Sequence, residues 1–225
     1  MSKVIAIDGP AGAGKSTISR LLARKLAYRY LDTGAMYRAI TYLALEEGID
    51  IHDTEEIVKL SKKIEMQITP PDENHISHII INGRDVTDSL RTKEVDLNVS
   101  TVAKNKAIRE LMTEMQRNIA SSGNIIMDGR DIGTRVLPDA DYKFFITASL
   151  EERARRRWKE LREKGLEVSL AEIEKEIAER DREDSTRELA PLVKAEDAIL
   201  IDTSNLSIQE VLDKLISYIK DEGNV

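Results

Sequence analysis

The chain has 225 residues, enough to bury a core, and its lack of cysteine excludes a disulfide framework, thiolate zinc sites and a cysteine nucleophile. Its net charge of −7 and its 4% of aromatic residues argue against a nucleic-acid-binding protein. We expect a cytoplasmic protein, because the first apolar run, Val4–Ile7, is too short for a signal peptide and no run is long enough to span a membrane.

A strand, a glycine-rich loop and a helix open the chain. The run Val4–Ile7 predicts a buried parallel strand, and an apolar stripe after the loop predicts the helix. The loop between them fits G-x-x-x-x-G-K-[ST], whose glycines let backbone N–H groups point at phosphate oxygens. Lys15 would reach the β- and γ-phosphates of a nucleotide, and Ser16 would offer its hydroxyl to Mg²⁺. This phosphate loop consists of Gly9, Pro10, Ala11, Gly12, Ala13, Gly14, Lys15, Ser16 and Thr17.

Strand and helix patterns alternate along the remaining chain, which predicts one P-loop-type α/β domain with a parallel sheet flanked by helices. Four further strands are expected, over Tyr28–Leu31, Asn124–Met127, Tyr142–Ile146 and Ala198–Ile201. Helices are expected over Thr33–Glu47 and about Val102–Ala120, and after the capping residues Asp53, Ser149, Ser169 and Ser207.

Residues 63–95 interrupt this alternation. Ile64–Ile68 alternates apolar and polar side chains, Ile76–Ile81 is rich in β-branched residues, and Thr69–Asn74 between them has the composition of a turn. We predict a small antiparallel insertion. The pattern alone leaves two interpretations open, an excursion at the edge of the sheet and a flap that handles substrate.

Arginines gather where the predicted strands end and helices begin, although the chain as a whole is acidic. Planar guanidinium groups bind phosphate through paired hydrogen bonds, and phosphoryl transfer depends on positioning and on neutralising charge. A single arginine is well explained as a solvated surface residue, but the set favours transfer between two phosphorylated molecules. It comprises Arg38, Arg109, Arg130, Arg153, Arg156, Arg157, Arg180 and Arg187.

Asp128 follows the predicted strand Asn124–Met127, at the edge of a parallel sheet where ligands bind. Its carboxylate could hold a Mg²⁺-bound water or orient a neighbouring arginine, and the alternative is an acid that caps the turn at Gly129. We favour a functional role because Arg130 and Asp131 follow immediately.

Several segments match the motifs of one enzyme family in order and spacing, from residue 1 to about residue 220. They are Gly9–Thr17, Thr33–Arg38, Val99–Ala103, Ile108-Arg109, Gln116-Arg117, Asp128–Thr134, Arg180–Arg187 and Ala190–Leu192. Together they resemble the bacterial cytidylate kinases, which belong to the nucleoside monophosphate kinases. The resemblance implies transfer of the γ-phosphoryl group of ATP to CMP or dCMP with Mg²⁺. The chain departs from the usual pattern at Thr33, where serine is more common.

The resemblance also implies roles for particular residues. The catalytic set would be Lys15, Arg38, Arg130 and Arg180. ATP would contact Arg157 and Arg187 in addition to the phosphate loop, and Ser16 would bind Mg²⁺. CMP would be bound by Thr33, Arg38, Ser100, Arg109, Asp128, Arg130, Asp131, Arg180 and Asp184. Residues from about 153 to 166 would form a lid, and residues 63–95 would be a monophosphate-binding subdomain in a core of residues 1–62 and 96–225.

An exocyclic amine beside ring acceptors distinguishes cytosine from uracil. The carboxylate of Asp131 suits the amine and the guanidinium of Arg109 suits the acceptors, whereas the carbonyl of uracil would face Asp131 unfavourably. We therefore expect CMP to be preferred over UMP.

Other functions stay open on these grounds. A kinase for UMP, AMP or shikimate would share the phosphate loop, and so would an ATPase or nucleotide sensor that transfers nothing. A GTPase is disfavoured because Asn105–Ile108 lacks the acid of the guanine-reading motif. The basic run Arg153–Lys159 fits a phosphate lid or a plain charged helix, since acidic residues flank it. We expect a monomer that binds nucleotides and neither nucleic acid nor membrane.

Overall fold

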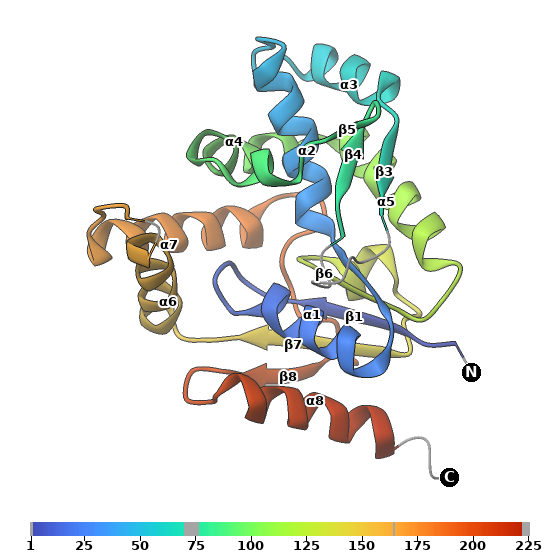
Figure 1. Cartoon of the computed structure of the whole chain (residues 1–225), viewed down its shortest axis with the longest axis vertical. Coiled ribbons are helices and arrows are strands. Elements are labelled where there is room, and N and C mark those ends of the chain that lie inside the picture. The colour runs from blue at the N-terminus through green and yellow to red at the C-terminus, as the bar shows by residue number, and fades with distance from the viewer. Residues whose placement is uncertain (1, 70–76, 164, 222–225) are drawn as a thin grey trace.

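A five-stranded parallel sheet forms the centre of the protein (Figure 1). The computed structural model describes residues 2–69, 77–163 and 165–221. The strand order is β2-β6-β1-β7-β8, and all five strands predicted from the sequence are confirmed to within two residues. The strands are β1 (Val4–Asp8), β2 (Arg29–Asp32), β6 (Ile125–Gly129), β7 (Tyr142–Thr147) and β8 (Ile199–Asp202).

Three neighbouring strands each carry an acidic residue at or one residue before their carboxyl end, at the same edge of this sheet. Asp32 of β2 is in register with Asp128 of β6, and Asp8 of β1 is in register with Gly129. Because carboxyl ends of parallel strands meet at one edge, the loops that follow them converge there. The register therefore brings the phosphate loop, which follows β1, beside the segment after β6.

Helices cover both faces of the sheet because successive side chains of each strand point to opposite sides. One face packs against α1 (Lys15–Leu26) and α8 (Ile208–Asp221) through a buried apolar cluster. The other face packs against α2 (Thr33–Glu46) and α5 (Lys106–Ala120) through a second cluster. Adjacent residues of β1 divide between them, since Ile5 lies in the first cluster and Ala6 in the second.

The predicted antiparallel insertion is confirmed as a separate three-stranded sheet of order β3-β4-β5. Its strands are β3 (Met66–Ile68), β4 (Ile79–Ile81) and β5 (Arg84–Asp85), and α3 (Thr54–Lys63) precedes them. Ile79 and Ile81 are buried in the same cluster as α2, so the small sheet is fixed to the core. Residues 70–74 of the predicted turn, and Ile76 of the predicted strand, lie outside the described residues.

The single helix predicted over about Val102–Ala120 is wrong, because Asn105 divides it. The first helix, α4 (Lys93–Lys104), follows the short 3₁₀ helix η1 (Thr87–Arg91), and α5 begins at Lys106. Asn105 is extended, and its side chain accepts hydrogen bonds from the N–H groups of Ala107 and Ile108, so it acts as an N-cap. The start of α4 at Lys93 also lies within the range assigned to the insertion.

Helices α6 (Leu150–Glu163) and α7 (Leu170–Thr186) pack on each other at one side of the molecule (Figure 1). Their contact is a small apolar cluster of its own, formed around Ala154, Ile173 and Ile177. The expected lid residues are therefore largely helical. Within the described residues, none of the helices combines the length and the apolar character that crossing a membrane requires.

Candidate active site

The phosphate loop begins against strand β7, and its first glycine is required by that packing. A Cβ atom on Gly9 would lie 1.9 Å from the carbonyl oxygen of Ile146, which excludes any other residue without backbone movement. Gly14, at the N-cap of α1, has a φ of 87° and gives the helix no side-chain cap. The backbone N–H groups at the start of α1 are consequently left to bind an anion.

The side chain of Lys15 folds back toward the phosphate loop. Its Nζ donates a hydrogen bond to the carbonyl oxygen of Pro10 at 2.7 Å, and only 6% of the residue is exposed. Burial, together with the guanidinium of Arg130, lowers the pKa of Lys15 to about 7. A bound phosphate would stabilise the charged form of the amine.

Ser16 and Asp128 bring two side-chain oxygens together beside the loop. The Ser16 hydroxyl donates to Asp128 Oδ2 at 2.9 Å, and the hydroxyl of Tyr30 donates to Oδ1 at 2.9 Å. Burial and the nearby charge of Asp32 raise the pKa of Asp128 to about 6. A hydroxyl and a carboxylate are hard ligands of the kind that Mg²⁺ takes, with water and nucleotide phosphates completing its shell. These side chains therefore fit a magnesium ion.

A second group of charged side chains lies after β6 and on α7. Arg130 Nε donates to Asp184 Oδ2 at 2.8 Å, and Arg187 approaches the other oxygen of Asp184 at 3.6 Å. Arg180 is half-buried, and its buried Nε has no hydrogen-bond partner among the described residues. Burial and the charges of Arg130 and Arg38 lower the pKa of Arg180 to about 10. Arginines outnumber carboxylates in this group, as is required of a site for an anion.

Arg109 and Asp131 form a buried ion pair next to this group. The distance from Arg109 Nη2 to Asp131 Oδ2 is 2.5 Å, and 1% and 5% of the two residues are exposed. Arg109 also donates to the carbonyl oxygen of Ala103 and lies over the ring of Tyr37. Its Nε has no partner among the described residues. The pair therefore contains a buried donor that is left without an acceptor.

A family model described as cytidylate kinase matches residues 5–221. The chain belongs to the cytidylate kinase family. The cytidylate kinase of Carboxydothermus hydrogenoformans is 52% identical over 221 residues, which cover 98% of this chain and 99% of the relative. That of Bacillus subtilis is 48% identical over 219 residues, 97% of each chain.

Solved structures resemble this cytidylate kinase family member in fold. The shikimate kinase from Acinetobacter baumannii in complex with shikimate matches with a TM-score of 0.50 and 16% identity, covering 100% of this chain and 97% of that one. An uncharacterized protein from Eubacterium ventriosum matches with a TM-score of 0.52 and 13% identity, covering 97% and 98%. At these identities the likeness establishes the fold alone.

Thr33 and Ser100, both expected to bind CMP, lie on separate helices. The hydroxyl of Thr33, at the start of α2, donates to the backbone carbonyl of Asp128 at 2.7 Å. That bond holds α2 to the end of β6, and the hydroxyl common to serine and threonine suffices for it. Ser100 lies on α4 and is half-buried.

Arg157 and Arg187, which we expect beside ATP, pair with carboxylates outside the phosphate loop. Arg187 approaches Asp131 at 3.8 Å, in addition to Asp184, so it lies with the residues expected to bind CMP. Arg157 pairs with Asp96 of α4 at 3.3 Å and with Glu160.

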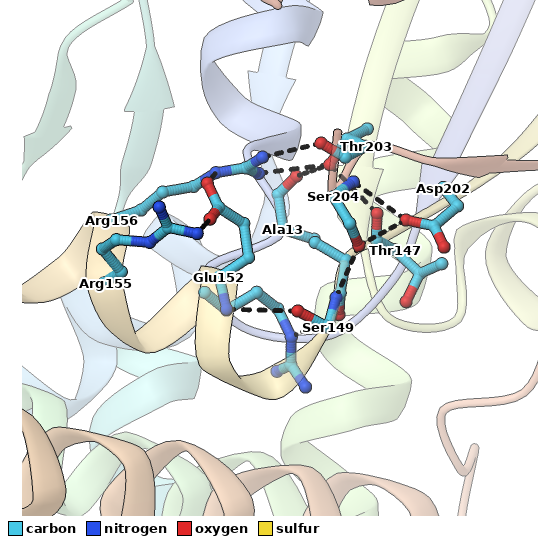
Figure 2. Close-up of polar contacts among 11 residues, drawn as sticks. Ala13, Thr147, Ser149, Glu152, Arg155, Arg156, Asp202, Thr203 and Ser204 are labelled. Atoms are coloured by element: carbon cyan, nitrogen blue, oxygen red, sulfur yellow. Dashed lines mark hydrogen bonds and ion pairs between the residues drawn. The ribbon is translucent and has the colours of Figure 1, made fainter. Parts of the chain in front are cut away.

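Of the basic run, Arg153 contacts the phosphate loop directly, and Arg156 is linked to it through Thr203. Arg153 Nη1 donates to the carbonyl oxygen of Ala11 at 3.0 Å. Figure 2 shows Arg156 of α6 directed at Thr203, which follows β8, and Thr203 in turn donates to the carbonyl oxygen of Ala13. Their place in the basic run was visible in the sequence, but nothing in it distinguished them from Arg157.

Asp8 and Tyr30 are site residues that sequence reasoning missed. Asp8 accepts hydrogen bonds from the N–H groups of Ile132 and Gly133 at 2.8 and 2.7 Å, which fixes the turn that carries Asp131. Burial raises the pKa of Asp8 to about 6, although these two hydrogen bonds oppose the rise. The sequence signals were slight: an acid at the end of the apolar strand β1, and a tyrosine in the short strand β2.

Proposed function

We propose that this protein transfers the γ-phosphoryl group of ATP directly to CMP or dCMP, giving ADP and CDP or dCDP. The observation that carries the proposal is one sheet edge with two anion sites, of which the second adjoins the buried Arg109–Asp131 pair. The relatives named cytidylate kinase support the same substrate.

ATP would lie on the phosphate loop, with its phosphates at the N-terminus of α1 and near Lys15. Arg153 joins this loop to the base of α6 directly and Arg156 joins it through Thr203, so we assign residues from about 153 to 166 the role of the lid. Mg²⁺, held by Ser16 and Asp128, would neutralise charge on the phosphates. Closure of the lid would exclude water and so protect ATP from hydrolysis.

The phosphate of CMP would be held by Arg38, Arg130 and Arg180, and we add Arg187 because it pairs with acceptor-side carboxylates. Asp184 would accept hydrogen bonds from the ribose. The phosphate oxygen of CMP is already an anionic nucleophile, so no general base is needed. The enzyme would act by aligning that oxygen with the γ-phosphorus and by offsetting the repulsion between two anions.

Cytosine would be read by the buried pair. Asp131 would accept from the exocyclic amine, and Arg109 would donate to the ring nitrogen and carbonyl. We assign residues 63–95 to the monophosphate-binding subdomain. Action as a monomer in the cytoplasm, without nucleic acid, stays a prediction.

An acceptor panel tests this function. ADP release is measured with ATP and Mg²⁺ in the presence of CMP, dCMP, UMP, AMP, shikimate or no acceptor. We expect CMP and dCMP to support fast release and the others to give little. Fast release with another acceptor would reassign the substrate, and equal release without acceptor would favour an ATPase.

A further inference from the structure

One carboxylate, that of Asp96 on α4, lies between two arginines from different parts of the chain. Its Oδ1 is 3.3 Å from Nε of Arg38 on α2, and its Oδ2 is 3.3 Å from Nη2 of Arg157 on α6. About a quarter of the Asp96 side chain is exposed. The carboxylate therefore joins an arginine expected at the CMP phosphate to an arginine of the proposed lid.

A third arginine is within electrostatic reach of the same carboxylate. The charge of Asp96 raises the pKa of Arg180, against the larger lowering by burial and by Arg130 and Arg38. Three guanidinium groups that would repel one another thus share this counter-ion. Sequence reasoning had assigned Asp96 no role, since an acid in the first turn of a helix is ordinary.

A carboxylate that places one oxygen on each of two guanidiniums uses the donors that a phosphoryl group would use. A phosphate entering between Arg38 and Arg157 would compete for those donors, and its negative charge would be repelled by Asp96. Binding would then require that the two ion pairs open.

We propose that Asp96 is an internal anion that occupies Arg38 and Arg157 in the nucleotide-free protein and competes with the phosphate of the acceptor for them. The inference rests on the proposed function. Because Asp96 lowers the affinity of the site for every anion, a small ligand such as inorganic phosphate binds poorly. A nucleotide, which adds contacts through its base and ribose, still binds. Asp96 thereby sets the affinity of the acceptor site.

The test is the Asp96→Asn variant, which keeps the shape of the side chain and removes its charge. The dissociation constant of inorganic phosphate and the KM for CMP are measured for this variant and the wild type. We expect both to fall by ~3- to 10-fold, from two partly exposed ion pairs that no longer compete. Glu94→Gln, an equal charge change at an exposed position of the same helix, is the matched control and should leave both constants unchanged.

An unchanged or weakened affinity for phosphate in Asp96→Asn would overturn the inference, because the carboxylate would then be neutral toward the anion or would help to place the arginines. Asp96→Ala, which also removes the charge, should give the same result and serves if the asparagine variant is unstable. Wild-type turnover separates the two claims. If the wild type does not phosphorylate CMP, the proposed function fails, whereas normal turnover with unchanged phosphate affinity in the variant rejects the role of Asp96 alone.

Discussion

Arg109 and Asp131 form an ion pair of 2.5 Å in a place where both residues are almost fully buried. Burying two charges contributes little net stability, because their desolvation offsets their attraction. The pair is instead suited to recognition, since it presents an acceptor and a donor side by side as cytosine requires. Asp8 supports this arrangement by fixing the turn after Asp131.

Asp131→Asn should reduce the preference for cytosine. The exocyclic amine would lose its charged acceptor, and Arg109 would be left buried without a counter-ion. We expect kcat/KM for CMP to fall by ~100-fold or more, and the ratio of CMP to UMP activity to fall with it. Steady-state kinetics with both nucleotides provide the measurement. An unchanged ratio would show that another residue reads the base.

Arg130→Ala should lower turnover much more than it alters the affinity for ATP. Arg130 lies on the acceptor side, where it donates to Asp184, and phosphoryl transfer depends on such charges. We expect kcat to fall by ~10³-fold while KM for ATP changes by less than about threefold. Normal turnover in this variant would show that Arg130 does not act on the reacting phosphates.

Tyr30→Phe should lower the apparent affinity of the enzyme for Mg²⁺. The variant leaves Oδ1 of Asp128 without the hydrogen bond from the tyrosine hydroxyl, and an unsatisfied buried group costs about 1–3 kcal/mol. We expect a higher Mg²⁺ concentration for half-maximal rate and a lower free energy of unfolding in urea. Mg²⁺ titrations identical to the wild type would contradict the role given to Tyr30.

The pKa of Asp8 predicts a pH dependence of stability. Its pKa in the folded protein is about 6, above the ordinary value of 3.8, so the folded state binds this proton more tightly than the unfolded state. The contribution of Asp8 to stability is therefore lost as the pH rises from about 4 to about 6, by on the order of 2–3 kcal/mol.

Urea unfolding of the nucleotide-free wild type and of Asp8→Asn between pH 4 and pH 7 measures this contribution. As the pH rises, the unfolding free energy of the variant should increase relative to that of the wild type. A difference that stays constant with pH would show that Asp8 titrates at its ordinary pKa.

The sequence was sufficient for the strands and the phosphate loop, because their signals are local. Val4–Ile7 is continuous and apolar, and the glycines of the loop follow it directly. The break at Asn105 was missed although an asparagine is a common N-cap. Apolar spacing continues across Asn105, so the two helices have the pattern of one.

The side chains that join separate elements could not be predicted in the same way. Asp96, Tyr30 and Asp8 each have an ordinary local explanation, and their roles depend on which strands and helices the fold brings together. The directions of Arg156 and Arg157 illustrate the same limit. They are neighbours on one helix, but one contacts Thr203 beside the phosphate loop and the other contacts Asp96 of α4.

The most direct test of the account follows the phosphoryl group itself. ATP labelled on its γ-phosphate is incubated with the protein, Mg²⁺ and CMP, and the label is traced to CDP or to inorganic phosphate. We predict that the label appears in CDP, and that replacing CMP by UMP largely abolishes transfer. Label released mainly as inorganic phosphate, at the same rate with or without CMP, would contradict the central claim.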